Sequence, residues 1–371
     1  EIEISRESKE IEEIRQREDL PRVKIVGTGG TIASFIEYTT GAVRPSATIE
    51  ELIKTIPEAA EIAYLESETV FNILSENMRP EYWEVVIEKI YESMKKSYNG
   101  IIVTHGTDTM SFTASAVAFA IQNMPVPVVF VGSQRSSDRP SSDSALNLIS
   151  ALIVATRAPI AESVIVMHSH TSDTLIGVYR GVKTRKMHTS RRDAFKSINE
   201  TPLALVDPYK REIKIINKNF RERGDREPVL MNGFERKVAL IYSYPGIDPE
   251  LIEFFIEKRY RGIVIAGTGF GHAPEYVIPA LKKAISSGIS VAITSQTLFG
   301  RVNLKVYQTG REMLMAGVIP CEDMLPEVAY VKLSWILKRT EDMDTIRRIM
   351  TTNIANEISY RHTEDLFYRV S

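Results

Sequence analysis

Residues 100–109 read Gly-Ile-Ile-Val-Thr-His-Gly-Thr-Asp-Thr. Other stretches of the chain show the same pattern of an aliphatic run followed by a polar loop. Consecutive aliphatic residues are typical of a strand that is buried on both faces, as in a parallel sheet. A polar loop follows the strand at once. Similar apolar runs followed by Gly or His occur at 23–27, 128–132 and 163–168. The sequence therefore predicts several buried strands that end in polar loops.

Stretches of helical length lie between these strands. Over residues 80–97 the apolar side chains recur at spacings of three and four, at Trp83, Val86, Ile87, Ile90, Tyr91 and Met94. Pro80 suits the first turn of a helix, and Asn99-Gly100 is a stop signal. Strands that alternate with helices predict an α/β fold with a mostly parallel, doubly wound sheet.

A charged stretch without a sustained period, residues 218–234, predicts a linker. After it, strands are predicted at 238–242, 262–266 and 290–294, and helices at 249–259 and 275–286. We therefore expect two doubly wound, mostly parallel α/β domains. The larger, N-terminal domain spans 21–217, the smaller, C-terminal domain spans 235–360, and 361–371 form a tail.

The composition is that of an ordinary globular chain, with 43% hydrophobic and 25% charged residues among 371. Its 46 basic and 48 acidic residues give a net charge of -2, so no global positive field attracts nucleic acid or an anionic membrane. The single cysteine, Cys321, excludes an internal disulfide and a multi-thiolate metal site. No apolar run approaches the roughly 18 residues of a membrane span. We expect a soluble, cytoplasmic protein.

Ligands of open parallel sheets bind at the carboxyl ends of strands, so the loops there are candidate sites. The first loop reads GTGGTI at 27–32, and Ile32 stands where a dinucleotide fingerprint needs glycine. Its glycines let the backbone approach a ligand, with the hydroxyl of Thr31 beside free N–H groups. A plain tight turn with a threonine cap is the alternative.

Two more loops carry polar groups. Residues 104–109 place three threonines and Asp108 behind a buried strand, although Asp108 and Thr109 are also suited to cap the helix predicted at 110–121. Residues 180–196 hold seven basic residues against one acid, Asp193. A solvated basic face is the default interpretation of this segment, and a lysine folded inward against Asp108 is the alternative.

The absence of several catalytic motifs excludes some reaction types. The sequence contains no HExxH, GxSxG or CxxC, and its six histidines do not cluster as ligands, so we expect no metal site. His105 is predicted to be a packed residue rather than a base. A threonine hydroxyl is inert at neutral pH without a base or a cation. A Thr-Asp-Lys group therefore predicts an acyl-transfer site, with backbone N–H groups as oxyanion donors.

Two motifs together, TGGTIA at 28–33 and HGTDT at 105–109, resemble the L-asparaginase/glutaminase family of bacterial type. Further segments resemble, more narrowly, the D-subunit family of archaeal glutamyl-tRNA(Gln) amidotransferases. These segments are FNI at 71–73, SENM at 75–78, GSQRSSDRP at 132–140, RKMHTSRRDAF at 185–195 and MLPE at 324–327. The resemblance covers about 21–360 and implies the two-domain asparaginase fold.

The resemblance also implies catalytic roles. Thr31 corresponds to the first catalytic threonine of the family, and Thr107, Asp108 and Lys186 correspond to its second threonine, aspartate and lysine. Lys186 is assigned by counting back from DAFKS at 193–197. Either threonine remains a candidate nucleophile.

Substrate-binding roles follow in the same way. Tyr38 matches the tyrosine of the flap that closes over the substrate, although the loop before it is shorter than in secreted asparaginases. Ser75 and Glu76 match the place where the family grips the substrate's α-amino and α-carboxylate groups. Secreted asparaginases usually carry Gln where Glu76 stands, which favours the amidotransferase branch.

The resemblance implies the glutaminase component of a tRNA-dependent amidotransferase, which hydrolyses glutamine and supplies ammonia to a partner, the amidotransferase E subunit. That partner converts Glu-tRNA(Gln) to Gln-tRNA(Gln), contacts most of the tRNA and is where ATP and Mg²⁺ are expected, so no cofactor is expected in this chain. A homodimer is also expected. The alternatives are a free-standing cytoplasmic L-asparaginase and a module that senses an amino acid without turnover.

The first twenty residues carry many charges and include isoleucines at positions 2, 4, 11 and 14. This composition predicts a solvated charged arm or linker. The chain starts with Glu1 rather than Met. Because the D-subunit family carries a small extra domain ahead of its asparaginase-like part, we expect 1–20 to be the end of an upstream domain.

Overall fold

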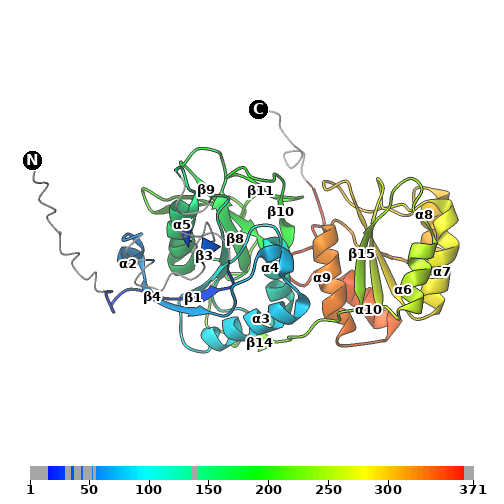
Figure 1. The fold of residues 1–371 in the computed structure, drawn as a ribbon, viewed down its shortest axis with the longest axis horizontal. Coiled ribbons are helices and arrows are strands. Elements are labelled where there is room, and N and C mark those ends of the chain that lie inside the picture. The colour runs from blue at the N-terminus through cyan, green and yellow to red at the C-terminus, as the bar shows by residue number, and fades with distance from the viewer. Residues whose placement is uncertain are drawn as a thin grey trace, which may run out of the picture.

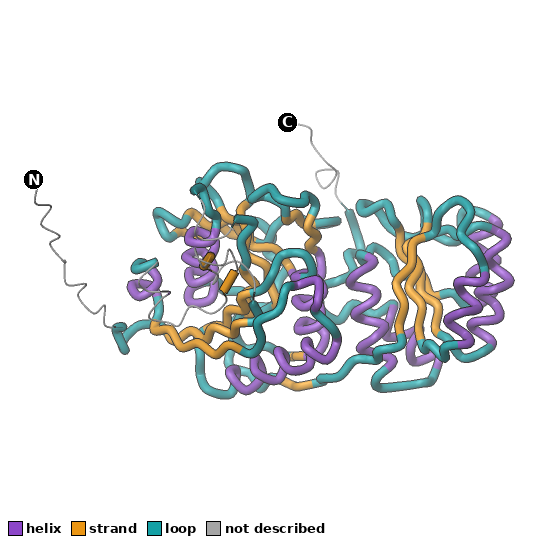
Figure 2. Tube along the Cα trace, in the orientation of Figure 1, coloured by secondary structure: helices purple, strands orange, loops and turns teal. Residues whose placement is uncertain are grey.

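The computed structural model describes residues 16–29, 35–36, 43–44, 52, 56–135 and 140–362. These residues form two α/β domains that lie side by side (Figure 1). Figure 2 shows that each domain is built around its own group of strands, with helices packed on the outside. The prediction of two mostly parallel α/β domains is confirmed.

The sheet of the first domain has eight described strands in the order β13-β12-β9-β8-β7-β5-β1-β4. Their bounds are Arg22–Gly27 (β1), Tyr64–Thr69 (β4), Gly100–Thr104 (β5), Val128–Val131 (β7), Ser163–His168 (β8), Ile176–Arg180 (β9), Ala204–Asp207 (β12) and Glu212–Ile215 (β13). The five strands from β4 to β8 pair in parallel, whereas β9, β12 and β13 extend the sheet in antiparallel fashion. The sequence pattern did not predict this antiparallel extension.

Helices cover both faces of this sheet, and three short strand pairs form separate two-stranded sheets among the described residues. The helices are α2 (Ala59–Ile62), α3 (Pro80–Met94), α4 (Met110–Ala120) and α5 (Ser144–Arg157), with 3-10 turns η2 (Ser75–Asn77) and η3 (Gly181–Lys183). The short pairs are β2 (Phe35–Ile36) with β3 (Val43–Arg44), β6 (Ile121–Gln122) with β14 (Val229–Leu230), and β10 (Thr184–Lys186) with β11 (Phe195–Ser197). The apolar faces of α3 and α4 pack in one core, and those of α2 and α5 pack in another.

The second domain has a four-stranded parallel sheet in the order β15-β16-β17-β18. The strands are Val238–Tyr242 (β15), Gly262–Gly267 (β16), Ser290–Ser295 (β17) and Ile319–Pro320 (β18). The helices are α6 (Glu250–Glu257), α7 (Ile278–Ser286), α8 (Gln308–Ala316), α9 (Pro326–Leu337) and α10 (Met343–Met350), and η4 (Glu275–Val277) precedes α7. A separate apolar core joins α6, α7 and α8 to one face of the sheet.

Helix α9 lies between the two sheets and joins the domains through a continuous apolar core (Figure 1). The rings of Phe119 in α4 and Trp335 in α9 have centroids 6.1 Å apart. Phe234, at the end of the predicted linker, is fully buried, with its ring centroid 5.4 Å from that of Trp83. The stretch 218–234 is therefore packed rather than free, because β14 pairs with β6 and Phe234 enters the core.

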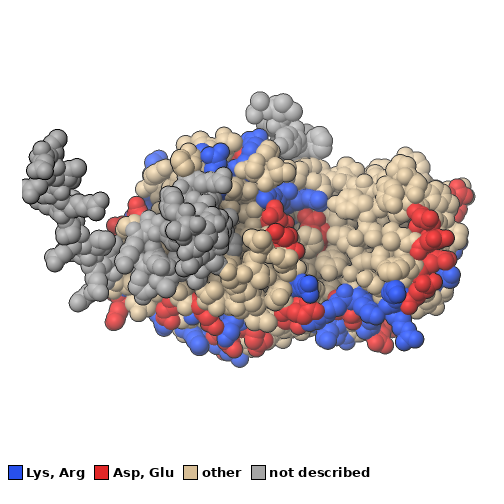
Figure 3. Space-filling view, in the orientation of Figure 1, with Lys and Arg blue, Asp and Glu red and all other residues tan. Residues whose placement is uncertain are grey.

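No helix in the described part of the chain is long and apolar enough to cross a membrane. On the face drawn in Figure 3, acidic and basic side chains alternate along the lower edge instead of forming a patch of one sign. This mixture is compatible with a net charge of -2.

Candidate active site

The candidate site lies where strands β1, β4 and β5 end. The parallel register places Gly27 opposite both Thr69 and Thr104, so the three strands reach their carboxyl ends side by side. Each loop that follows carries residues of a sequence motif. This is the edge of an open α/β sheet at which ligands bind.

A tight turn begins the first loop. The hydroxyl of Thr28 donates a hydrogen bond of 2.9 Å to the carbonyl oxygen of Thr104, which ties the turn to β5. Gly29 has φ of +104°, and a Cβ atom there would lie 2.5 Å from the carbonyl oxygen of Ile73. Only glycine meets both demands. Thr31 and Tyr38, predicted as a catalytic and a flap residue, lie outside the described residues.

His105 opens the loop after β5 and is buried. Its Nδ1 lies 2.7 Å from the carbonyl oxygen of Gly106, and its Nε2 lies 2.8 Å from the hydroxyl oxygen of Thr113. Burial lowers the pKa of His105 to about 4, although the hydrogen bond to the Gly106 carbonyl opposes this. At neutral pH it is an uncharged, packed residue, as the sequence analysis expected.

Ser75 locks the loop after β4 to the loop after β5. The hydroxyl of Thr109 donates to the carbonyl oxygen of Ser75 at 2.7 Å, and the backbone N–H of Asp108 donates to the Ser75 hydroxyl at 3.3 Å. Gly106 allows this contact, since a Cβ atom there would lie 2.7 Å from the Cβ of Ser75. Ser75 is buried, whereas its neighbour Glu76 is exposed.

The alternative of simple helix caps at Asp108 and Thr109 is wrong. Thr109 is the residue that precedes α4, yet its side chain makes no capping hydrogen bond. Its hydroxyl binds the Ser75 carbonyl instead, and Asp108 faces a lysine. The two side chains therefore connect separate segments of the chain.

Lys186 reaches this loop from far along the sequence. Its Nζ lies 2.8 Å from the Thr107 hydroxyl oxygen and 2.8 Å from Oδ1 of Asp108. The lysine side chain is 14% exposed and the Asp108 side chain 64% exposed, so the carboxylate is on the solvent side of the amine. An amine in contact with a threonine hydroxyl is suited to accept the hydroxyl proton once the amine is neutral.

The segment 180–196 is not a free basic face. Each of its seven basic residues contacts a carboxylate: Arg180 contacts Glu162 and Glu200, Lys183 contacts Asp323, Arg185 contacts Glu327, Lys186 contacts Asp108, Arg191 and Lys196 contact Asp193, and Arg192 contacts Asp173. The default interpretation as a solvated patch is wrong. The inward lysine, the alternative that the sequence left open, is the arrangement in the structure.

The loop after β7 belongs to the same edge of the sheet. Asp143 accepts hydrogen bonds of 3.0 Å from the backbone N–H groups of Gln134 and Arg135, and it also binds the side-chain amide of Asn147. Asn147 in turn donates to the carbonyl oxygen of Gly132. The motif at 132–140 resembles the D-subunit family, and its residue pattern predicted no role for it. The hydrogen bonds show that Asp143, which follows the motif, orders its first part.

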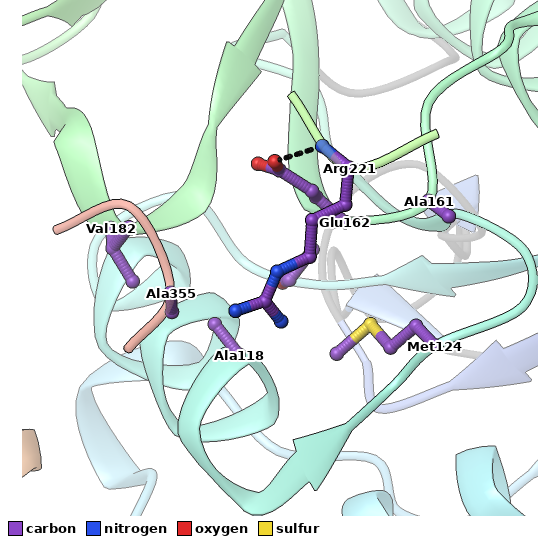
Figure 4. A pocket seen from close by; sticks show the side chains of 8 residues that line it. Ala118, Met124, Ala161, Glu162, Val182, Arg221 and Ala355 are labelled. Atoms are coloured by element: carbon purple, nitrogen blue, oxygen red, sulfur yellow. Dashed lines mark hydrogen bonds between the residues drawn. The ribbon is translucent and has the colours of Figure 1, made fainter. Parts of the chain in front are cut away.

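One small pocket lies apart from this site. It surrounds Glu162 and Arg221, at the amino ends of the strands, and the Arg221 backbone N–H donates to Glu162 at 2.8 Å (Figure 4). The centre of a water molecule has only about 10 Å³ of space there. That volume holds about one water and no amino acid.

Comparisons with known proteins agree with this architecture. The asparaginase N-terminal domain family matches residues 22–221, and the glutaminase/asparaginase C-terminal domain family matches 237–350. Among solved structures, the thermostable L-asparaginase from Thermococcus kodakarensis has a TM-score of 0.83 at 32% identity, covering 92% of this chain and 100% of that one. L-asparaginase I from Vibrio cholerae has a TM-score of 0.79 at 28% identity, covering 92% and 99%.

Relatives at higher identity carry a narrower name. The glutamyl-tRNA(Gln) amidotransferase D subunit of Thermococcus kodakarensis is 50% identical over 374 residues, which cover 99% of this chain and 84% of that protein. The corresponding D subunit of Thermofilum pendens is 52% identical over 347 residues, covering 93% and 77%. The chain therefore belongs to the D-subunit family of glutamyl-tRNA(Gln) amidotransferases, within the asparaginase/glutaminase family.

Proposed function

We propose that this chain hydrolyses the side-chain amide of glutamine and supplies the ammonia to the amidotransferase E subunit, which uses it to convert Glu-tRNA(Gln) to Gln-tRNA(Gln). The observation that carries the proposal is the amine of Lys186, held 2.8 Å from both Thr107 and Asp108 in a chain half identical to its D-subunit relatives. This geometry suits acyl transfer to a hydroxyl.

The chemistry proceeds in two displacements. A threonine oxygen bonds to the amide carbon of glutamine while its proton passes to the amine of Lys186, directly if Thr107 attacks and through Thr107 if Thr31 attacks. Backbone N–H groups of the loops after β1 and β5 stabilise the oxyanion. The C–N bond then breaks as Lys186 returns the proton, and ammonia leaves. Water then attacks the acyl-threonine ester, the bond to the threonine oxygen breaks, one proton of the water returns to that oxygen, and glutamate is released.

Thr31 and Thr107 are both candidates for the attacking residue. Thr107 has the amine of Lys186 at its hydroxyl. Thr31 comes two residues after Gly29 in the sequence, and Gly29 lies at the same edge of the sheet. A diazoketone analogue of glutamine, followed by peptide mapping, locates the covalent adduct. An adduct on either threonine identifies the nucleophile, and an adduct on another residue type rejects threonine attack.

Substrate binding is assigned to Ser75, Glu76 and Tyr38. Ser75 is buried at the junction of two loops, and the exposed Glu76 next to it offers a carboxylate for the substrate's α-amino group. Loss of that charge in Glu76→Gln should raise the KM for glutamine more than it lowers kcat. Glu88→Gln, at an exposed position on α3, is the matched control and should leave both constants unchanged.

The deciding experiment measures ammonia release from glutamine and from asparagine. The isolated chain is compared with its complex with the E subunit, in the presence and absence of Glu-tRNA(Gln), ATP and Mg²⁺. The proposal predicts glutamine hydrolysis that depends strongly on the partner and the charged tRNA. The structural similarity to L-asparaginases supports the second candidate, a free-standing L-asparaginase. Robust asparagine hydrolysis by the isolated chain would establish that candidate and overturn the first.

The assembly and the location follow from the same proposal. The chain is expected to form a homodimer that binds the E subunit in the cytoplasm, where charged tRNA is made, and to need no cofactor of its own. Analytical ultracentrifugation of the chain, alone and with the E subunit, tests the assembly. A chain that stays monomeric and does not bind that partner contradicts it.

A further inference from the structure

An ion pair links the active-site strand to the second domain. Arg185, the residue before Lys186 on β10, places Nη1 3.3 Å from Oε2 of Glu327 in the first turn of α9. Its Nη2 lies 3.4 Å from the hydroxyl of Tyr242, at the end of β15. Arg185 therefore touches two elements of the second domain, and Glu327 belongs to the MLPE motif to which the proposed chemistry gives no part.

The position of Glu327 calls for an explanation. Its side chain is 7% exposed, and burial raises its pKa, while the charge of Arg185 opposes that shift. A buried carboxylate is costly, and an apolar residue would fill the same space at least as well. An ion pair of this kind is weak evidence for a contribution to stability. A role in orientation explains better why the charge is there.

The strand that carries Lys186 is short, and the buried pair of Lys183 with Asp323 anchors the turn just before it. β10 has three residues and, within the described part of the chain, pairs only with β11, which also has three. Its first residue, Thr184, is buried, whereas Arg185 and Lys186 are half-buried, so side-chain contacts are needed to fix these two residues. Along a strand, successive side chains point to opposite sides. Arg185 can therefore contact the second domain while Lys186 faces Thr107 and Asp108.

Helix α9 also supports the other half of the site. It packs along α4, the helix that begins directly after the Thr107–Thr109 loop. The rings of Phe112 in α4 and Tyr330 in α9 have centroids 6.1 Å apart. One helix of the second domain thus contacts both the helix behind Asp108 and, through Glu327, the strand of Lys186.

We propose that Arg185 and Glu327 are positioning residues, whose ion pair holds β10 on α9 so that the amine of Lys186 stays at Thr107 and Asp108. The second domain thereby takes part in catalysis within the same chain. The inference rests on the proposed function for its kinetic test, and it has a second test that does not need turnover.

The kinetic test uses the complex with the E subunit, with glutamine and charged tRNA. Arg185→Met removes the cation and keeps the aliphatic stem, and Glu327→Gln removes the negative charge and keeps the shape. A displacement of about 1 Å at a reacting group can cost about 100-fold in rate. We expect each variant to lower kcat by about 10- to 100-fold, with the KM for glutamine within about twofold of the wild type. Arg185→Lys, which keeps the charge, should recover part of the loss.

Arg236→Met is the matched control. Arg236 also joins the domains, through Glu84 on α3 at 2.7 Å, and is 37% exposed compared with 29% for Arg185. It should leave kcat within about twofold of the wild type. An equal loss in both methionine variants would mean that domain docking in general is required, and the proposal would be overturned. An unchanged kcat in Arg185→Met, or a raised KM alone, would overturn it as well.

The second test measures how fast acetic anhydride modifies Lys186, by digestion of the labelled protein and mass spectrometry of its peptides. A lysine held by Thr107 and Asp108 reacts slowly, and its release should raise the rate several-fold in Arg185→Met but not in Arg236→Met. This readout separates the two proposals. A wild type that releases no ammonia rejects the proposed function, whereas equal modification rates in the two variants reject the positioning role.

Discussion

The two domains share one architecture but differ in what their hydroxyl groups contact at the carboxyl edge of the sheet. In the second domain, Thr268 donates to the carbonyl oxygen of His272 at 3.3 Å, and Ser295 donates to that of Gly269 at 2.6 Å. In the first domain, the Thr107 hydroxyl is held by the amine of Lys186. A parallel sheet brings polar loops to one edge in both cases, but only a nearby base makes a hydroxyl reactive.

The first domain differs from the second in the amine at its threonine hydroxyl, and replacing Lys186 removes that amine. Lys186→Ala should lower kcat for amide hydrolysis by about 1000-fold or more, because general acid–base catalysis by one group contributes up to about 10⁴-fold. The melting temperature should change little, since the ion pair with Asp108 is partly exposed. Lys283→Ala, which removes an exposed pair with Glu253 at 2.9 Å in the second domain, is the control. Substantial activity in Lys186→Ala would reject the assignment.

A smaller effect is expected when the hydroxyl is removed and the lysine is kept. Thr107→Val has nearly the same shape, so it should fold normally. If Thr107 relays the proton, kcat should fall by about 100-fold, whereas loss of all turnover would identify Thr107 as the nucleophile. Thr268→Val makes the same change at the corresponding edge of the second domain and should leave kcat unchanged. Steady-state kinetics of both variants test the comparison. Equal losses would show that both edges serve the reaction.

The smallest effect concerns stability and pH. The pKa of the buried His105 falls from 6.5 to about 4 in the folded state, so the unfolded chain takes up this proton first as the pH drops. The stabilisation is complete above about pH 6.5 and is lost between 6.5 and 4. From pH 7 to 5 the contribution of His105 falls by about 2 kcal/mol.

Denaturant unfolding at both pH values measures this effect as the difference between the wild type and His105→Gln. His272, in the second domain, is only partly buried; burial lowers its pKa, and the loss of stability on acidification should be smaller for it. His272→Gln is therefore the matched variant. If removing His105 leaves the pH dependence of the unfolding free energy unchanged, its imidazole is not held neutral by burial.

Much of the fold could be predicted because buried strands and helices show a characteristic hydrophobic pattern in the local sequence. All five residues of β5 are buried, and an uninterrupted apolar run is what such a strand requires. Helix α3 showed its buried stripe at the expected spacing. Strands β12 and β13, by contrast, have four residues each and are the last two strands at one end of the sheet, where β13 forms the edge. Short strands at the end of a sheet carry too little pattern to be recognised beforehand.

Some residues of the candidate site could also be predicted from the sequence, and some of its contacts could not. Thr107 and Asp108 were recognisable because they follow a buried strand directly, and loops at that place meet at one edge of the sheet. The contacts of Ser75 with Thr109, and of Arg185 with Glu327, were not predicted. They join residues that lie 34 and 142 positions apart in the chain, and no local periodicity records such a pairing.

The sequence by itself determined the class of fold, the loops that carry the chemistry and the threonine, aspartate and lysine types that belong there. It did so because buried strands need apolar runs and reactive loops need polar side chains next to them. The residue pattern left open which of the seven basic residues meets Asp108. The family resemblance named Lys186, and only the tertiary structure showed the contact. Lys186 lies 78 positions from that aspartate, and a three-residue strand that Arg185 links to Glu327 of α9 carries the lysine to it.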